Sequence, residues 1–474
     1  MAVRRRMPLI IAFIACCLLG YTVLWIRTSN PPYEALEQHI SSPKPMHPVE
    51  EPVSVDEQYL AFFTHSGFQN QLIQAWYLNR TLLLPRALFG QPFGWSLFDK
   101  LHIEHQLRDV TLSPAQACIQ HDAELERYGV ECPEPNRYTM MPFDEIFDLD
   151  WAKQHVRIVS RDDMSYEWME KNFEIARAGA ANQDNGSYVD GDILFFKDET
   201  RYNWRIFDTP HQSERLGKYL ASLDIYQMRE FPQKLIHFGS LFGSGKMPIR
   251  RPEHYEFLRK LQRSIVYRHP VVTEVADNFL QSLGGPGAFI GLHISPLTIV
   301  AADFFRSGDG WFVQALPRNV QNAVTQITLS IDKHPDVPSL QEQLAIIPQN
   351  PQFDQCLTLA KTRNVTLIYM ATDAPHPSSN SDFAILYSSF PCTFTIDSFS
   401  TKLNQPAWNS LSNATNAHDG TPMKKYLIPL IDATIASRGR LFIGTEASTF
   451  SGYVYRLHDV FWSQQAADAL TGQR

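Results

Sequence analysis

The sequence predicts an α/β protein with two parallel β-sheets, each covered by helices. Short apolar runs of strand length alternate with stretches of helical spacing in residues 58–85, and again in residues 289–457. Such alternation is typical of parallel sheets with helices on both faces. Roughly 420 residues remain after an apolar N-terminal segment and a polar linker, enough for two sizeable cores.

The first predicted unit opens at Gln58–Thr64, an apolar run that resembles a strand. A turn with glycine follows at residues 65–70, and residues 71–79 carry apolar side chains at helical spacing. Residues 81–84 form a second strand-like run, closed by Pro85. Strand, turn, helix and strand in this order predict the start of a parallel βαβ sheet.

The second half repeats this order more clearly. Its expected strands are 289–293, 365–371, 393–396 and 441–443, and its expected helices are 383–388 and 423–437. We therefore expect two Rossmann-like domains that face a cleft, at residues 56–260 and 261–474. Ligands of open α/β sheets bind beyond the carboxyl ends of the strands, where residues 65–70, His293, Asp373 and 444–451 fall.

Residues 444–451 join the last predicted strand to a helix that continues through Tyr453–Leu457. Free backbone N–H groups and the positive end of the helix dipole meet in such a loop, and Ser448, Thr449 and Ser451 add hydroxyl donors. The loop is therefore suited to a phosphate. The alternative is that these hydroxyl groups only cap the helix, as Ser and Thr often do.

The N-terminus predicts a single-pass type II membrane protein. Three arginines at residues 4–6 precede an apolar segment at 8–26, long enough to cross a bilayer. The positive-inside rule makes residues 1–7 a cytoplasmic tail and places everything after the segment on the luminal or extracellular side. Of these we expect the lumen of the Golgi or ER. Residues 27–55 are rich in Pro, Ser and charge, and we interpret them as a stem.

The cysteines and the charge agree with this placement. Beyond the apolar segment lie Cys118, Cys132, Cys356 and Cys392, and their order favours the pairs 118–132 and 356–392 among three possible pairings. Acceptor sequons for N-glycosylation begin at residues 79, 185, 364 and 413. A formal net charge of −8 argues against nucleic acid as a partner.

Four motifs in order resemble those of the GDP-fucose protein O-fucosyltransferase-like family, particularly its fungal type II membrane members. They are His65–Gln71 with Asn79–Pro85, then Ala371–Asp373, then Gly444–Ser451. The resemblance covers roughly residues 57–460. It implies the two-domain GT-B fold and an inverting transfer of fucose from GDP-fucose to a protein or glycan hydroxyl. It also implies no cofactor and no metal in the donor site.

The resemblance also assigns roles in donor binding. The backbone of Gly67, Phe68 and Asn70 would approach the donor phosphates, and Asp373 would hydrogen-bond the guanine. Ser448 and Thr449 would place hydroxyls on the phosphates, with the Phe450 ring near the nucleoside. A metal-free site stabilises the leaving diphosphate with arginine, N–H groups and hydroxyls.

One motif departs from the family pattern of His-x-Arg followed by Gly-Asp. Here Ile294 and Ser295 follow His293, so serine stands where the family has arginine. An arginine and a Gly-Asp pair occur further along, in Arg306-Ser-Gly-Asp309, after an insertion of about a dozen residues. Either Arg306 returns to the site as the catalytic arginine, with Asp309 in the donor site, or the donor arginine is lost. Neither lysine nor water can reproduce the bidentate contact that the planar guanidinium group of arginine makes with a phosphate.

Two other functions are alternatives to metal-free fucose transfer. Asp148-Leu-Asp150 and Asp190-Gly-Asp192 match the Asp-x-Asp pattern of metal-dependent glycosyltransferases. The second alternative, indicated by Ser295 in place of arginine, is a pseudo-glycosyltransferase that binds a GDP-sugar or a glycoprotein without turnover. The sequence identifies neither the acceptor nor the catalytic base that an inverting transfer requires.

Overall fold

A computed structural model describes residues 57–63, 68–90, 96–108, 114–132, 138–181, 186–210, 216–241, 245–299, 312–333, 337–399, 405–446 and 448–471. All of them belong to one compact unit, Val49–Arg474. The predicted tail, membrane segment and stem lie outside the described residues. Within these ranges, no helix is both long and apolar enough to span a membrane.

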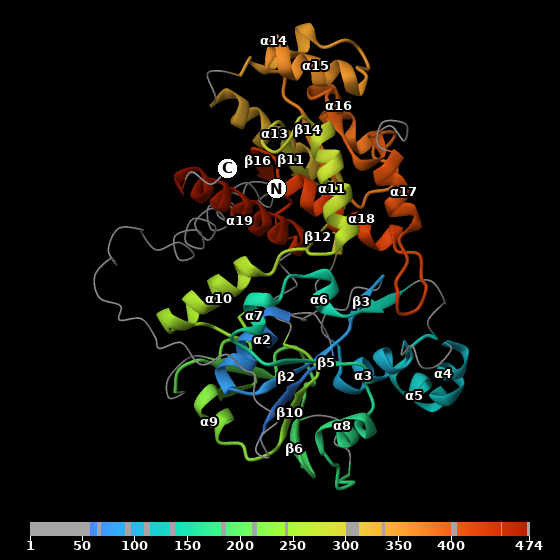
Figure 1. Ribbon diagram of the computed structural model, residues 1–474, viewed down its shortest axis with the longest axis vertical. Coiled ribbons are helices and arrows are strands. Elements are labelled where there is room, and N and C mark those ends of the chain that lie inside the picture. The colour runs from blue at the N-terminus through green and yellow to red at the C-terminus, as the bar shows by residue number, and fades with distance from the viewer. Residues whose placement is uncertain are drawn as a thin grey trace, which may run out of the picture. The chain divides into compact units, whose positions relative to one another are not determined.

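Six of the described strands form the first sheet, in the order β5-β2-β1-β10-β7-β6. They are β1 (Tyr59–Ala61), β2 (Thr81–Pro85), β5 (Ile158–Arg161), β6 (Gly186–Asp190), β7 (Ile193–Lys197) and β10 (Leu235–Phe238). Every neighbouring pair is parallel except β6 and β7, an antiparallel hairpin at one edge. Helix α2 (Phe68–Leu78) connects β1 to β2, so the predicted βαβ start of the chain is confirmed (Figure 1).

A second described sheet has the order β15-β14-β11-β16, and its three neighbouring pairs are parallel. Its strands are β11 (Ile290–His293), β14 (Ile368–Ala371), β15 (Thr393–Phe394) and β16 (Leu441–Ile443). The two mainly parallel sheets confirm the α/β class predicted from the alternating pattern. Each of these strands lies within or beside the range that the sequence predicts for it.

Helices cover both faces of the second sheet. Ile290 and Leu292 pack on one face with side chains of α13 (Leu316–Asp332). Tyr369 and Phe442 belong to the cluster that includes α11 (Pro270–Ser282) and α18 (Lys424–Ser437). Gly291 is required at this second interface, because a Cβ atom there would lie 1.9 Å from the carbonyl oxygen of Ala436.

Other helices and short strands complete the described chain. The helices are α3 (Phe98–Gln106), α4 (Pro114–Gln120), α5 (Asp122–Tyr128), α6 (Phe143–Ile146), α7 (Asp150–Lys153), α8 (Tyr166–Phe173), α9 (Ile225–Arg229), α10 (Pro252–Ser264), α14 (Leu340–Ile346), α15 (Phe353–Arg363), η1 (Ser381–Phe383), α16 (Ala384–Ser389), η2 (Ile396–Ser398), α17 (Gln405–Asn413) and α19 (Thr449–Thr471). The paired short strands are β3 (Ala87–Phe89) with β4 (Thr139–Met141), β8 (Trp204–Phe207) with β9 (Ala221–Asp224), and β12 (Leu297–Ile299) with β13 (Phe312–Gln314).

Three local features differ from the sequence-based expectation. Helix α2 begins at Phe68, earlier than the predicted Gln71. Helix α19 begins at Thr449, so Thr449, Phe450 and Ser451 belong to its first turn rather than to the loop. The insertion after His293 contributes an antiparallel strand, β12, which pairs with β13.

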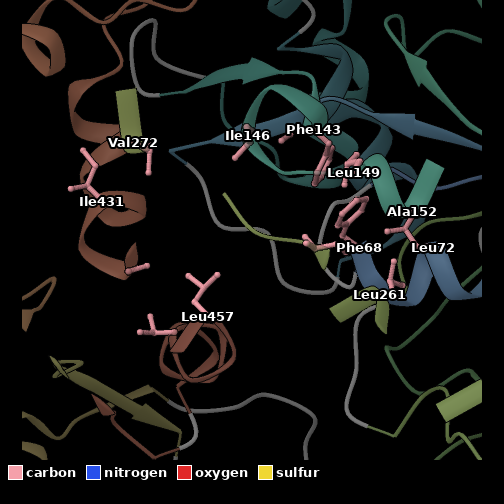
Figure 2. Close-up of a cluster of buried hydrophobic side chains, with 14 of the residues drawn as sticks. Phe68, Leu72, Phe143, Ile146, Leu149, Ala152, Leu261, Val272, Ile431 and Leu457 are labelled. Atoms are coloured by element: carbon pink, nitrogen blue, oxygen red, sulfur yellow. The ribbon is translucent and has the colours of Figure 1, made fainter. Parts of the chain in front are cut away.

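One hydrophobic cluster contains residues of both halves of the described chain. Phe68 and Leu72 of α2 belong to it, as do Val272 of α11, Ile431 of α18 and Leu457 of α19 (Figure 2). The ring of Phe147 lies 6.4 Å from that of Phe68 and 6.4 Å from that of Tyr453 in α19. Aromatic side chains therefore connect the start of α2 with the first turns of α19.

A loop at residues 414–423 makes a polar contact between the halves. Asn416 is buried, and its Nδ2 donates to Thr139 Oγ1 at 2.6 Å and to the Met140 carbonyl at 2.9 Å. Thr139 Oγ1 in turn donates to Asp419 Oδ2 at 2.6 Å. His418 Nε2 lies 2.7 Å from Glu145 Oε1 in α6.

Both pairs of cysteines form disulfides. Cys118 bonds to Cys132, and Cys356 bonds to Cys392. The pairing favoured by the order of the cysteines is therefore confirmed. The second disulfide is fully buried and ties α15 to the residue before β15.

Candidate functional site

The carboxyl ends of β11, β14 and β16 meet at one edge of the second sheet, because the three strands are parallel neighbours. Hydrogen bonds join the residues that follow them. Thr372 Oγ1, after β14, donates to the Ile294 carbonyl at 2.7 Å. Thr445, after β16, donates its hydroxyl to the His293 carbonyl at 3.1 Å and accepts the backbone N–H of Ser295 at 3.0 Å. Three of the loops predicted to converge are thus brought together.

The side chain of Ser451 connects the loop after β16 to the end of β11. Its hydroxyl is buried, accepts the backbone N–H of Thr445 at 2.9 Å and lies 2.7 Å from Nδ1 of His293. Gly444 is required beside it, since a Cβ atom there would lie 2.7 Å from Cβ of Ser451. The side chain therefore fixes the loop after β16 against the end of β11, instead of pointing outward as a free donor.

His293 is buried and uncharged. Burial lowers the pKa of His293 to about 4, so the ring is neutral at pH 7. The direction of its hydrogen bond with Ser451 follows the ring tautomer, because a hydroxyl oxygen that accepts one N–H can still accept or donate a second hydrogen bond. His293 is therefore a neutral side chain that holds Ser451 through Nδ1, and not a source of positive charge.

Ser448 caps helix α19. Its hydroxyl accepts the backbone N–H of Ser451 at 3.3 Å, and its own N–H donates to the Thr445 carbonyl at 3.3 Å. Ser448 therefore acts as an N-cap, and its predicted contact with a phosphate stays a prediction. Thr449 is exposed at the start of the helix. The Phe450 ring lies 4.6 Å from the His293 ring, and this contact belongs to the same edge.

A small cavity of about 50 Å³ opens beside this network, between the loop after β16 and helix α13. His293 and Thr445 line it, together with the amide side chains of Asn319, Asn322 and Gln326. Asn319 also donates to the Ser295 carbonyl at 2.8 Å. No motif in the sequence marks these amides, although their spacing places them on one face of a helix.

Asp373 lies at the same edge, directly after Thr372, and its side chain is exposed. Thr372 Oγ1 accepts the backbone N–H of Ala374 at 3.2 Å, which turns the chain after β14. Asp373 therefore lies beside the edge that β11, β14 and β16 share, and its hydrogen bond to guanine stays a prediction.

The residues predicted in the first half have structural contacts of their own. Phe68 is buried and stacks on Phe143 at 4.4 Å between ring centroids. Asn70 Nδ2 donates to the Leu241 carbonyl at 3.2 Å, just beyond β10. Gly67 lies outside the described residues. The side chain of Phe68 therefore belongs to the core, and only its backbone remains available for the predicted role.

Arg306 and Asp309 also lie outside the described residues, in the segment that connects β12 to β13. Ser295, two residues beyond β11, occupies the position where the resembling motif has arginine. Its carbonyl and N–H are both hydrogen-bonded, to Asn319 and Thr445. The backbone at this position is therefore fixed to the site.

The acidic pairs of the metal-dependent alternative have protein partners. Asp190 accepts hydrogen bonds from Arg177 and from two backbone N–H groups, and Asp192 accepts one from a backbone N–H group. Asp148 accepts the N–H of Asp150. Over the part of the chain that the structure describes, no cluster of three or more His, Cys, Asp or Glu side chains could hold a metal ion.

Comparison with known proteins finds little. No family model matches the chain, and none of the curated proteins matches it. Two similar solved structures are crystal structures of POFUT1, one in complex with GDP-fucose and one with GDP. Each is 12% identical with a TM-score of 0.35 and covers 86% of this chain, and the match spans 95% and 96% of their own chains. At this identity and TM-score, neither structure transfers its ligand or activity to this chain.

Proposed function

We propose that the chain is a GT-B-like glycosyltransferase that transfers fucose with inversion from GDP-fucose to a hydroxyl of a protein or glycan. The observation that carries the proposal is the network of His293, Thr445 and Ser451 at the shared strand edge. This network fixes the loop after β16 and the first turn of α19 before any ligand binds. The ordered motifs that resemble the O-fucosyltransferase-like family support the choice of donor.

The proposed donor site uses prearranged backbone N–H groups. At the start of α19 the helix dipole and the free N–H groups favour the negative charge of a diphosphate. Thr449 is exposed there and supplies a hydroxyl, Phe450 lies against the nucleoside, and Asp373 binds the guanine. The backbone of Gly67, Phe68 and Asn70 approaches the phosphates from the first half. Neutral His293 holds the first turn of α19 in place through its hydrogen bond with Ser451.

In the proposed reaction, the acceptor oxygen forms a bond to C1 of fucose while the bond from C1 to the diphosphate oxygen breaks. GDP leaves with the electron pair, and the acceptor proton passes to a base that remains unassigned. Arg306 stabilises the charge that develops on the diphosphate, Asp309 takes part in donor binding, and no metal is required. The reaction takes place in the lumen of the Golgi or ER, where a type II membrane anchor holds the enzyme.

The test uses the full chain and compares Arg306→Ala with Arg318→Ala, an exposed arginine of α13. We expect GDP, but not UDP, to raise the melting temperature of all three proteins. Fucose transfer should fall about 10²–10³-fold in Arg306→Ala, the size expected for the loss of one charge-stabilising donor. Arg318→Ala should retain wild-type activity. The donor assignment fails if GDP stabilises none of these proteins.

The alternative of a pseudo-glycosyltransferase is favoured by Ser295, which lies two residues beyond β11 in place of arginine. It predicts stabilisation by GDP together with no fucose transfer and no donor hydrolysis in the wild type. Activity that Arg306→Ala abolishes would exclude it. The third possibility, a metal-dependent glycosyltransferase, would lose its activity in EDTA, whereas the proposed metal-free enzyme would retain it.

A further inference from the structure

A cavity of about 410 Å³ lies at the amino-terminal edge of the second sheet. Its lining includes residues just before β11, β14 and β16, namely Ala288, Leu367 and Arg440, together with Leu357 and Ala360 of α15. Because the strands are parallel, this edge is opposite the one that carries His293 and Thr445. The volume falls in the range of roughly 300–1,000 Å³ that is typical of small-ligand sites.

The lining is amphipathic. Leu357, Ala360 and Leu367 contribute aliphatic surface, while the exposed Lys361 and Arg440 contribute hydrogen-bond donors. No described residue forms an ion pair with either cation. A sugar has the matching chemistry, with apolar C–H faces and acetamido methyl groups beside hydroxyl and carbonyl oxygens that accept hydrogen bonds.

Asn364 lines the same cavity. It ends α15 as an exposed residue in the left-handed conformation, with φ 53°, and begins the acceptor sequence Asn364-Val-Thr366. Two disulfides among the described residues indicate an oxidising compartment, in which such sequences are glycosylated. Asn79 and Asn413 also begin acceptor sequences and are exposed, but neither lines this cavity.

We propose that Asn364 carries an N-linked glycan and that its first sugar residues occupy the adjoining cavity. In the modification, the Asn364 amide nitrogen forms a bond to C1 of an N-acetylglucosamine. The bond from this carbon to the diphosphate of a lipid-linked oligosaccharide breaks, and the amide proton is lost to solvent. The inference rests on the luminal placement within the proposed function, but not on any transfer activity.

Occupation of the cavity has two physical consequences. The sugar covers aliphatic surface of α15 that would otherwise face water, and it gives Lys361 and Arg440 oxygen partners. It also leaves the opposite edge of the sheet open, so the glycan does not obstruct the candidate donor site. The glycan therefore stabilises the second half of the chain without a part in substrate binding.

The test expresses the full chain in a eukaryotic secretory host and measures occupancy of each acceptor asparagine by mass spectrometry of glycopeptides. Peptide-N-glycosidase is then applied to the native protein. We expect occupancy at Asn364, and release of its glycan at least about tenfold slower than release from Asn413, because the bond is reached only after the sugar leaves the cavity. In denatured protein the two rates should be equal.

Two variants separate attachment from occupation of the cavity. Ala360→Phe fills the cavity, so Asn364 should stay glycosylated while its glycan is released as fast as that of Asn413. Asn364→Gln should lower the melting temperature, whereas Asn413→Gln should not. An unmodified Asn364 would refute the proposal, as would equal native release rates in the wild type. If only Asn413 is modified, luminal placement stands and the assignment of Asn364 alone is wrong.

Discussion

Ser451 shows how one buried hydroxyl can support a site without touching a ligand. Replacing it with alanine leaves the N–H of Thr445 and Nδ1 of His293 without their partner. We expect Ser451→Ala to lower the free energy of unfolding by about 1–3 kcal/mol, the cost of buried unsatisfied polar groups. GDP binding should weaken as the loop loosens.

Denaturant titration and a GDP thermal shift check this prediction. For the free energy of unfolding alone, Thr449→Ala is the matched control, because Thr449 is an exposed hydroxyl of the same helical turn. It should change the free energy of unfolding by less than about 0.5 kcal/mol. Equal losses in the two variants would contradict the role assigned to Ser451.

Asp432 makes stability depend on pH. Burial raises the pKa of Asp432 to about 7, and its carboxylate accepts the hydroxyl hydrogen of Tyr369. The folded state therefore binds a proton that the unfolded state has already lost above about pH 4, so stability falls as pH rises toward about 7. The loss amounts to at most about 4 kcal/mol. It is absent below the unfolded pKa.

Asp432→Asn removes this titration and keeps an oxygen acceptor for Tyr369. We expect the variant to be more stable than the wild type at pH 8, with a smaller difference at pH 5. Melting temperatures measured from pH 4 to 8 test the sign. A wild type whose stability rises over this range, with a flat profile in the variant, would show that the shift has the opposite direction.

At the scale of elements, the loop at 414–423 holds the two halves of the described chain together through Asn416. Asn416→Ala would leave Thr139 Oγ1 and the Met140 carbonyl without their buried donor. We expect a loss of about 1–3 kcal/mol and faster proteolysis within the loop. His418→Ala is the control, since its pair with Glu145 is partly exposed and worth about 0–1 kcal/mol. Larger damage from the control would contradict the importance of Asn416.

The strands predicted in residues 58–85 and in the second sheet were confirmed, whereas no element was predicted between residues 86 and 288. The apolar run at 81–84 became β2, which is buried throughout, because a strand buried on both faces leaves a short continuous apolar pattern. The run at 441–443 became β16, in which Phe442 and Ile443 are buried and Leu441 is exposed. The start of α19 was not predictable. Ser448, Thr449 and Ser451 all suit an N-cap, and only the hydrogen bond from Ser451 N–H to Ser448 Oγ selects Ser448.

At the scale of the whole molecule, the two disulfides should contribute unequally. Cys356 and Cys392 are separated by 36 residues and fully buried, whereas Cys118 and Cys132 are separated by 14. Loop-closure entropy assigns about 4 and about 3 kcal/mol to them. We expect Cys356→Ala with Cys392→Ala to lower the melting temperature more than the corresponding change at 118 and 132. The reverse order in calorimetry would contradict this ranking.

The sequence by itself determined the α/β class, because the alternation of apolar runs and helical spacing is a local pattern that burial imposes on each element. It also placed His293, Asp373 and residues 444–451 at strand ends, since parallel strands share an edge. Only the tertiary structure decided what these side chains do there. The Ser451 hydroxyl turned inward to His293, and Phe68 turned into the core, because hydrogen-bond partners and packing neighbours come from segments far apart in the chain.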